Sequence, residues 1–288
     1  MQYPINGNLA GVVILYNEDP HKIIENILSY STKLDKIYLY DNSTVKNIDW
    51  EIHLNKLGNK VEYVFFGENL GIAKRLNTAA LSAIKDGYSF LLTMDQDSSF
   101  SETSFENYLE NISQCTISNV GQFGINFQPK FTKVEDLVKE VDILITSGSI
   151  ICLDHFKLIG KFNENLFIDF VDIDFSFRVN DAGFKNIQFM NVLLNHQIGE
   201  LIWGRSLKNL KLTRRIIHSP IRVYYIVRNG LFLFFRSSYL NKKYKIEVIR
   251  RMKILKNNYL YHPNLSKVYI YTLVGVIDFL RNKMGKKA

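Results

Sequence analysis

Two aspartates, Asp95 and Asp97, directly follow a short apolar run from Phe90 to Met94. Such a run is typical of a buried parallel strand whose carboxyl end opens into a site. Residues two apart in an extended segment project to the same side, so both carboxylates can face one hard divalent cation that would also hold nucleotide phosphates. Acidic residues also begin loops and cap helices, so this interpretation depends on the surrounding sequence.

A second group of carboxylates falls within eleven residues of the stretch from Asn163 to Arg178. Its members are Glu164, Asp169, Asp172 and Asp174, interspersed with phenylalanine and isoleucine. Carboxylates mixed with apolar residues are expected to be partly buried, and crowding of like charges can raise one pKa toward a value suited to accepting a hydroxyl proton. Asp174 and Arg178 have helical i, i+4 spacing, and we expect them to form a structural pair.

The elements needed to position these groups begin at the N-terminus. Leu9 to Tyr16 reads as a buried strand, and Pro20 is placed to start a helix through about Tyr30. Lys36 to Tyr40 reads as a second strand, ending at Asp41-Asn42-Ser43. Ligands of open α/β sheets gather at the carboxyl ends of the strands, where Asp41 can accept hydrogen bonds from a base or ribose. The alternative is that Asp41 and Asn42 only make an Asx turn.

A glycine-containing turn follows the third expected strand, Val61 to Phe66. It runs from Gly67 to Gly71 and opens a helix, Ile72 to Lys85, that contains Lys74, Arg75 and Asn77. Backbone N–H groups and a guanidinium at such a turn can lie near a diphosphate. The first hundred residues thus read strand, helix, strand, strand, helix, strand, which predicts a nucleotide-binding α/β half with right-handed crossovers.

The later elements are less regular. We expect a helix from Glu102 to about Gln114, a strand near Gly121 to Gln128, a β-rich run from Asp142 to Cys152, and a last strand from Phe184 to Asn195. Gly148 lies inside the β-rich run, where it can admit a ligand or mark a bulge.

Length and composition favour an ordinary globular chain. It has 288 residues, 47% hydrophobic and 22% charged, with two cysteines in no metal-binding spacing. These values predict a full core and a reducing compartment, and argue against structural zinc. The N-terminus shows no signal-peptide pattern, and the apolar stretch from Val268 to Leu280 is too short to span a membrane.

Charge divides the chain near residue 200. Residues 1–200 carry 16 Lys and Arg against 26 Asp and Glu, a net −10, whereas residues 201–288 carry 20 against 2, a net +18. We therefore expect a catalytic domain at 1–200, with halves of about 1–100 and 101–200, and a basic aromatic helical extension at 201–288. Its amphipathic helices are expected at Leu231 to Phe235, Lys242 to Lys245 and Val268 to Lys287. They suit an anionic membrane surface, with packing on the core as the alternative.

Four motifs together resemble the family 2 glycosyltransferases of the GT-A fold, in order and spacing as well as in residue type. They are Leu15-Tyr16-Asn17, Asp41-Asn42-Ser43, Asn69-Leu70-Gly71 with Asn77, and Asp95-Gln96-Asp97. The chain most resembles the bacterial rhamnosyltransferase-like branch, in which a proline-started helix such as the one at Ser219-Pro220 crosses the site edge. The resemblance implies a mixed α/β nucleotide-sugar transferase domain.

The resemblance also implies roles for individual residues. The catalytic base falls on Asp172, although Val171 stands where the family commonly has Glu, and Asp169 could share the role. A metal, Mg²⁺ or Mn²⁺, is expected at Asp95 and Asp97 with His196. The donor nucleotide is expected at Tyr16, Asn17, Asp41, Asn42, Arg75, Asn77, Asp95 and Gln96. The candidates for the acceptor side or for phosphate are Ser147, Gly148, Asp169, Arg178, Arg222 and Arg228.

The reaction implied is inverting transfer of a sugar to a hydroxyl of a glycan or polyprenyl-linked acceptor in bacterial surface polysaccharide synthesis. The favoured donor is dTDP-rhamnose, with UDP-galactose, UDP-glucose or UDP-galactofuranose as alternatives. The implied location is cytoplasmic, peripheral on the inner face of the cell membrane. Oligomeric state stays open, with a dimer as one option. Nucleotidyl transfer and nucleic-acid binding are the rival functions; no triphosphate signature or nucleic-acid module supports them.

Overall fold

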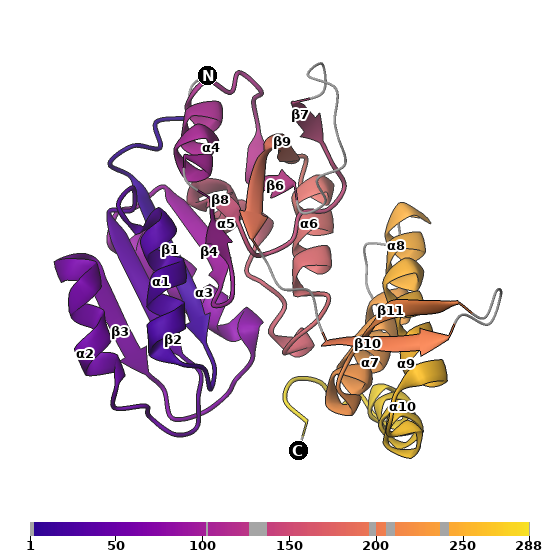
Figure 1. Ribbon diagram of the computed structural model, residues 1–288. Helices are drawn as coiled ribbons and strands as arrows, with labels where there is room; N and C mark the ends of the chain where they lie inside the picture. Colours follow the sequence, from indigo (N-terminus) through magenta and orange to yellow (C-terminus); the bar gives the residue numbers. More distant parts are fainter. Residues whose placement is uncertain are drawn as a thin grey trace. The chain divides into compact units, whose positions relative to one another are not determined.

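The computed structural model describes residues 3–101, 103–126, 137–195, 200–205, 211–236 and 242–287. The chain forms two compact units (Figure 1). The first contains Met1–Glu164 and Val171–His196, and the second contains Asn165–Phe170 and Gln197–Ala288. The short segment Asn165–Phe170 therefore belongs with the C-terminal residues, although residues of the first unit flank it on both sides.

A mixed sheet forms the centre of the first unit. Its parallel part has the order β3-β2-β1-β4, made by β1 (Leu9–Leu15), β2 (Lys36–Asp41), β3 (Val61–Phe65) and β4 (Phe90–Asp95). The sheet continues as β8-β6-β9-β5, made by β5 (Ser99–Phe100), β6 (Val120–Asn126), β8 (Ser149–Cys152) and β9 (Lys185–Asn195), and β7 (Val138–Glu140) pairs with β9. Strand β8 runs antiparallel to both β4 and β6, which makes the sheet mixed.

Alternation along β2 shows which helices cover each face of the sheet. Ile37 and Leu39 join a core with residues of α1 (Pro20–Ser31) and α4 (Ser104–Ser113). Tyr38 and Tyr40 point to the opposite face, where their hydroxyls donate to Asp86 and Ser82 at the end of α3 (Ile72–Lys85). Because both faces of the sheet are covered, the central strand β1 is apolar throughout, and the strand ends are where a ligand can approach.

The remaining elements of the first unit are short. They are α2 (Trp50–Leu54), a 3-10 helix at Asn55–Lys60, α5 (Leu153–Ile159) and α6 (Val171–Asp181). A buried network fixes α6: Ser176 Oγ accepts from Gln122 Nε2 at 2.9 Å and from the Leu144 N–H at 3.1 Å. A further 3-10 turn, Glu164–Leu166, precedes α6.

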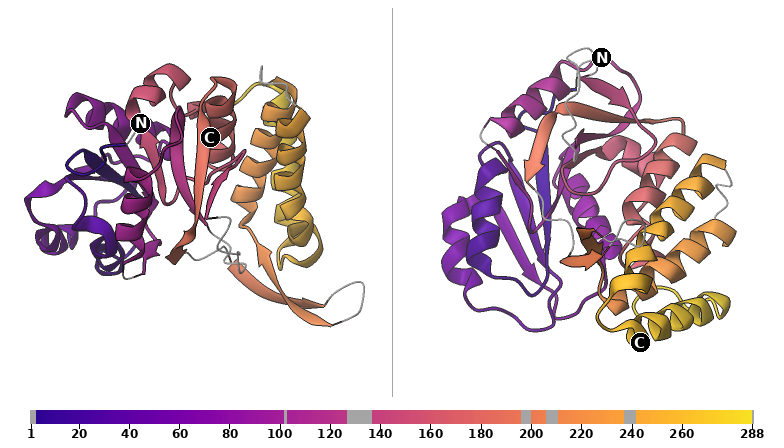
Figure 2. Two further views of the ribbon diagram at one scale, coloured as in Figure 1. Left: turned by 90° about the horizontal axis from the view of Figure 1, so that it is seen from above. Right: turned by 45° about the vertical axis from the view of Figure 1, so that its right-hand side comes forward.

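The second unit combines helices with one hairpin. Its helices are α7 (Pro220–Arg236), α8 (Lys242–Met252), α9 (Lys256–Tyr261) and α10 (Leu265–Leu280), with a 3-10 turn at Lys253–Leu255. Strands β10 (Glu200–Arg205) and β11 (Leu212–Ile217) form an antiparallel hairpin that extends beyond these helices (Figure 2). Gly275 lets α10 approach α7, since a Cβ there would lie 2.9 Å from the Tyr224 carbonyl oxygen. Within the described residues, no helix combines the length and apolar character needed to cross a membrane.

Most expected elements are confirmed, including the helix Ile72–Lys85 and the helix begun by Pro220. The strand expected to end at Asn195 is confirmed as β9, Lys185–Asn195, but it is not the last strand, because β10 and β11 follow it. Only Ser149–Cys152 of the expected β-rich run is a strand, and α2 was not predicted. The residues expected at the outer limits of two elements, Glu102 and Gln128, lie outside the described residues.

Candidate active site

Polar segments meet at the carboxyl ends of three neighbouring strands, β2, β1 and β4. Gln96, just after β4, binds the backbone of Tyr16, just after β1. Its Oε1 accepts from the Tyr16 N–H at 2.8 Å, and its Nε2 donates to the Tyr16 carbonyl at 3.2 Å. Asn17 is tied to the end of β2, because its N–H donates to Ser43 Oγ at 2.9 Å. The motifs predicted from sequence are thus connected to one another.

Asp41 makes the Asx turn that was one of its two predicted roles. Its Oδ1 accepts from the Ser43 N–H at 2.9 Å, and its Oδ2 accepts from the Tyr63 hydroxyl at 2.7 Å. The carboxylate nevertheless borders a cleft of about 470 Å³. The cleft is lined by residues after β1 and β2 and by α2: Leu15, Tyr16, Asn17, Glu18, Asp19, Asp41, Ser43, Val45, Asn47, Asp49 and Trp50.

Trp50 is one of several cleft residues that sequence reasoning missed, together with Val45, Asn47 and Asp49. It is 2% exposed and stacks on Tyr63, with ring centroids 5.6 Å apart. The sequence signal that could have revealed Trp50 is a single tryptophan in a polar segment. A large aromatic side chain in such a place must pack against something.

Arg75 holds the turn that precedes α3 in place. Its Nε donates to Asn42 Oδ1 at 2.9 Å, its Nη2 donates to the Glu68 carbonyl at 3.0 Å, and its guanidinium lies 3.5 Å from the Phe66 ring centroid. Burial lowers the pKa of Arg75. Asn42 also accepts from the Leu70 N–H and donates to Asn69. These contacts favour a positioning role for Arg75 and Asn42 over direct contact with a diphosphate.

Asn77 connects α3 to a distant part of the chain. Its Nδ2 donates to the Phe162 carbonyl and to Glu164 Oε1, both at 2.9 Å, and its Oδ1 accepts from the Phe162 N–H at 2.8 Å. Glu164 also pairs with Lys74 at 3.0 Å. Burial tends to raise the pKa of Glu164, but its bonds to Asn77 and Lys74 leave that pKa lowered overall.

Asp95 and Asp97 lie half-buried at the end of β4. The Asp95 N–H donates to Ser147 Oγ at 3.1 Å, and that hydroxyl donates to Ser98 Oγ at 2.9 Å. Two half-buried carboxylates at a strand end supply the oxygen ligands that a hard divalent cation prefers. His196, the predicted third ligand, lies outside the described residues, and among those that are described no three acidic, histidine or cysteine residues cluster as a metal site.

Gly148 has a structural reason to be glycine. Its φ is 78°, and a Cβ would lie 2.5 Å from Ile125 Cδ1. Its N–H donates to the Thr93 carbonyl at 2.9 Å, and its carbonyl accepts from the Tyr108 hydroxyl at 3.1 Å. The turn places Ser147 beside Asp95, so both expected acceptor-side residues support the end of β4.

Asp172 begins α6 as its second residue and is half-buried. Its Oδ1 accepts from the Ile173 N–H at 2.9 Å, in the first turn of the helix. The predicted pair of Asp174 and Arg178 is confirmed, with Nε and Oδ2 2.9 Å apart. Burial raises the pKa of Asp174 although the adjacent Arg178 opposes this. Arg178 also donates to the carbonyls of Ile159 and Gly160, which favours a structural role.

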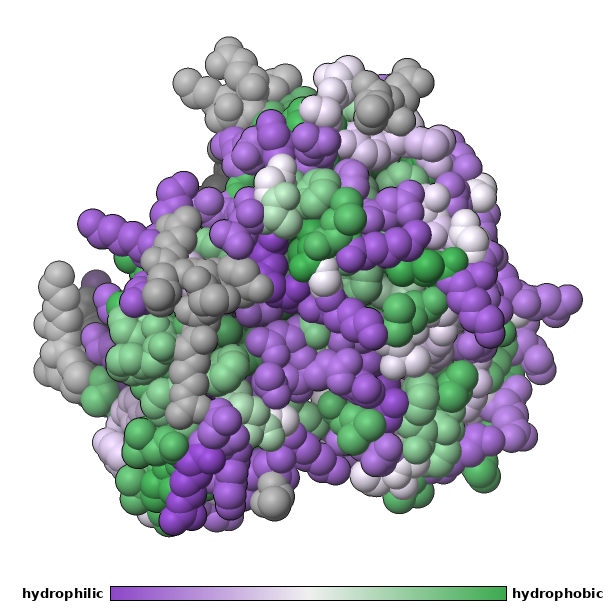
Figure 3. Space-filling model, turned by 180° about the vertical axis from the view of Figure 1, so that it is seen from behind, coloured by the Kyte–Doolittle hydropathy of each residue, from purple (hydrophilic) through white to green (hydrophobic). Residues whose placement is uncertain are grey.

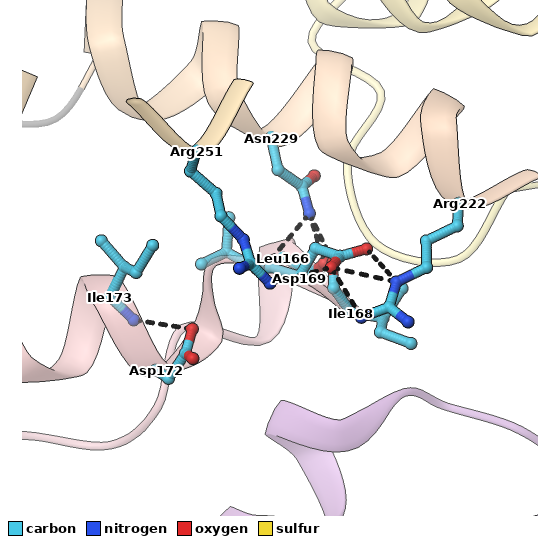
Figure 4. Close-up of polar contacts among 8 residues, drawn as sticks. All are labelled: Leu166, Ile168, Asp169, Asp172, Ile173, Arg222, Asn229 and Arg251. Carbon is cyan, nitrogen blue, oxygen red and sulfur yellow. Dashed lines mark hydrogen bonds and ion pairs between the residues drawn. The ribbon is translucent and has the colours of Figure 1, made fainter. Parts of the chain in front are cut away.

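The other candidates belong to the second unit (Figure 4). Asp169 forms an ion pair with Arg222, whose Nη2 lies 3.1 Å from Oδ1, and its side chain is 1% exposed. Arg228 is fully buried and donates to the Gly285 carbonyl at 2.8 Å and the Tyr224 hydroxyl at 3.0 Å. These contacts favour structural roles over the expected base function of Asp169 and phosphate contact of Arg228.

Comparison with known proteins decides the family. Residues 12–163 match the profile described as glycosyl transferase family 2, which covers more than half of the chain. The chain belongs to glycosyl transferase family 2. This family 2 chain is also 26% identical over 251 residues to the dTDP-rhamnosyl transferase RfbF of Shigella flexneri, covering 80% of each chain. Within the family, the chain therefore resembles a dTDP-rhamnosyl transferase.

Solved structures show that this family 2 protein has the GT-A fold. S. aureus TarS 1-349 in complex with UDP-GlcNAc has a TM-score of 0.61 and 14% identity, and the match covers 95% of this chain and 81% of that one. The mannosyltransferase PcManGT of Pyrobaculum calidifontis, in complex with GDP-Man and Mn²⁺, has a TM-score of 0.56 and 13% identity, with coverage of 96% and 88%. At these identities the likeness establishes the fold alone.

Proposed function

We propose that this glycosyltransferase transfers rhamnose from dTDP-rhamnose, with inversion, to a hydroxyl of a glycan or polyprenyl-linked acceptor in surface polysaccharide synthesis. The observation that carries the proposal is the match to a dTDP-rhamnosyl transferase over 80% of both chains. UDP-galactose, UDP-glucose and UDP-galactofuranose are the alternative donors. The test therefore has to compare donors directly.

The nucleoside of the donor is assigned to the cleft beside β1 and β2. Asp41 and Trp50 line it, as do the backbone and side chains of Tyr16 and Asn17. The volume of about 470 Å³ is within the range of small-molecule sites. Tyr16 is 45% exposed, so its ring can pack on a base.

The diphosphate is assigned to the end of β4. Asp95 and Asp97, with His196, would hold Mg²⁺ or Mn²⁺, because carboxylate oxygens and an imidazole are suitable ligands for these ions. When bound, the ion would neutralise charge that builds on the leaving nucleoside diphosphate. Ser147 keeps the backbone at Asp95 in place through its 3.1 Å hydrogen bond, and so supports the geometry of both carboxylates.

Asp172 is assigned as the general base. Its carboxylate accepts the proton of the acceptor hydroxyl while that oxygen attacks the anomeric carbon, and the bond from that carbon to the diphosphate breaks on the opposite face. One displacement of this kind inverts the anomeric centre. Asp169 is less suited to the role because Arg222 holds its buried carboxylate.

The second unit is assigned to an anionic membrane surface on the cytoplasmic side. Helix α10 exposes apolar side chains at Tyr269, Ile270, Leu273 and Leu280. Basic residues lie at or beyond its two ends, at Lys267, Arg281, Lys283, Lys286 and Lys287. Figure 3 shows hydrophobic and hydrophilic side chains intermixed over the described part of one side of the molecule. Apolar side chains between basic residues, as on α10, suit shallow contact with lipid headgroups.

The decisive experiment is hydrolysis and transfer with a panel of nucleotide sugars, with Mg²⁺, with Mn²⁺ and with EDTA. Asp97→Asn and Asp172→Asn are compared with Asp181→Asn, an exposed aspartate at the far end of α6. We expect one donor to be used, loss of transfer in EDTA and in the first two variants, and normal activity in the third. Binding of none of the donors would refute the transferase proposal.

The membrane assignment has its own test. Sedimentation with vesicles containing anionic lipid should exceed that with neutral vesicles and should fall at high salt. Leu273→Ser should reduce it, whereas Leu158→Ser, an exposed leucine of α5 in the first unit, should not. Equal binding to both vesicle types would contradict the assignment.

A further inference from the structure

The segment just before α6 has an unfavourable backbone conformation. Phe167, Asp169 and Phe170 have φ values of 52°, 62° and 68°, in the left-handed region that residues with a Cβ rarely adopt. Two of the three are bulky aromatic residues. Such a conformation persists only where the surroundings determine it, so the contacts of Leu166–Phe170 require an explanation.

One buried side chain holds the backbone of this segment. The Nδ2 of Asn229, on α7, donates to the carbonyls of Leu166 at 2.6 Å, Ile168 at 2.8 Å and Asp169 at 3.3 Å (Figure 4). Asn229 is 0% exposed. Its Oδ1 accepts from Arg228 Nε and Nη2 at 3.1 and 2.9 Å, which fixes the orientation of the amide. A single amide group therefore holds three of the segment's backbone carbonyl groups.

Ion pairs hold the Asp169 side chain of the same segment. Arg222 Nε lies 3.2 Å from each oxygen of Asp169, and Arg251, on α8, lies 4.0 Å from Oδ1 (Figure 4). The side chains of Arg222 and Arg251 are 40% and 36% exposed, whereas the Asp169 side chain is 1% exposed. Arg222, Asn229 and Arg251 all belong to the second unit, on helices α7 and α8.

The strained segment is covalently connected to the first unit. Phe170 is followed directly by Val171, the first residue of α6, and Asp172 is the second. Because each residue has only two soft dihedral angles, the φ and ψ of Asp169 and Phe170 set the direction in which the helix starts. The orientation of the Asp172 carboxylate is therefore determined in part by residues 166–170.

We propose that Arg222 and Asn229 are positioning residues for Asp172: by holding residues 166–170 in the left-handed conformation, they direct its carboxylate toward the acceptor hydroxyl. This inference rests on the proposed role of Asp172 as base. On this proposal, residues of the second unit contribute to catalysis because their segment is covalently linked to α6, whether or not the second unit binds a membrane. It also explains why the strained conformation is kept next to the base.

The test uses the full chain and the variant Arg222→Met, with Arg250→Met as the matched control. Arg250 is an exposed arginine of α8 that forms an ion pair with Glu247 of the same helix. In Arg222→Met we expect kcat for transfer to fall by about 10- to 100-fold, as a small misplacement of a reacting group does. The KM for donor should stay within about twofold, because that substrate is assigned to strand ends remote in sequence.

Two further readouts separate positioning from stability. Amide hydrogen exchange of residues 166–173 should increase in Arg222→Met and not in Arg250→Met. Arg222→Lys keeps the positive charge but loses the forked geometry of the guanidinium, and it should give an intermediate kcat. This variant replaces Arg222→Met in the test if Arg222→Met does not fold. The acid limb of the kcat profile against pH should shift in Arg222→Met, since the environment of the base changes.

The proposal is overturned if Arg222→Met exchanges faster at residues 166–173 yet keeps its kcat, or if only its melting temperature changes. It is also overturned if KM for donor rises in proportion to the loss of kcat. A wrong assignment of Asp172 as the base would give a different result. In that case Asp172→Asn would retain transfer, whatever the activity of the Arg222 variants.

Discussion

The carboxamide of Asn77 clamps the backbone of Phe162 from two sides, donating to its carbonyl at 2.9 Å and accepting from its N–H at 2.8 Å. Asn77 is 2% exposed, so Asn77→Ala would leave both backbone groups buried without these partners. We expect the free energy of unfolding to fall by about 2–4 kcal/mol, measured by urea denaturation.

Glu164→Gln is the matched control for this clamp. The glutamine can keep an oxygen facing Asn77 but loses the half-exposed ion pair with Lys74, so its cost should stay below about 1 kcal/mol. Equal destabilisation by the two variants would mean that the ion pair, rather than the clamp, stabilises this junction.

Gly148→Ala should be more destabilising than Gly87→Ala. Both glycines have positive φ, 78° and 89°, so both substitutions carry the cost of a left-handed residue, about 1–2 kcal/mol. Only at position 148 does the added methyl group also meet Ile125 Cδ1, at 2.5 Å, which adds about 1–3 kcal/mol of overpacking. Thermal unfolding of the two variants provides the comparison, and a Gly87 variant that is the less stable of the two would refute it.

Ser147→Ala should weaken the dependence of activity on metal without unfolding the protein. It removes the acceptor of the Asp95 N–H and the donor to Ser98 Oγ. We expect half-maximal transfer to require about 10-fold more Mn²⁺, as for loss of other groups that support metal ligands. Ser101→Ala, at an exposed serine whose hydroxyl bonds to that of Ser104, should leave the Mn²⁺ titration unchanged.

His218 should make the protein less stable as pH falls. Burial, with the nearby Arg222 charge, lowers the pKa of His218 to about 4 from its ordinary 6.5. Between pH 6.5 and 4 the unfolded chain binds a proton at this site and the folded chain does not, so the free energy of unfolding decreases by up to about 1.4 kcal/mol per pH unit. Above pH 6.5 the residue contributes no pH dependence.

Substitutions at two histidines check this assignment. His218→Gln should flatten the dependence of stability on pH between 4 and 6.5, whereas His21→Gln, at an exposed histidine, should leave it intact. If stability depends on pH equally steeply in the His218 variant, other groups must cause that dependence.

Local patterns were sufficient to predict the parallel half of the sheet. The alternation in Lys36–Asp41 and the turn before Ile72 are properties of neighbouring residues, and both elements formed where expected. The motifs at the ends of β1, β2 and β4 were also predicted to lie together, which the contacts of Gln96 with Tyr16 confirm.

Partners distant in sequence could not be predicted in the same way. Arg75 and Asn77 had the residue types of ligand contacts, but the bonds from Asn77 to Phe162 span 85 residues. Likewise, no local pattern pairs Asp169 with Arg222, 53 residues away. The hairpin of β10 and β11 was missed because Arg205 and Arg214 lie in strands that the basic composition had suggested were helical.

The path of the chain between its two units has a consequence for synthesis. Residues 165–170 are synthesised before residues 171–196, which complete the first unit, yet their partners Arg222, Asn229 and Gly285 are synthesised later still. The left-handed segment must therefore wait for these residues before its conformation is fixed. A growing chain that has reached only residue 200 lacks all three partners, so the segment next to the candidate base takes its final conformation after the rest of the first unit has been synthesised.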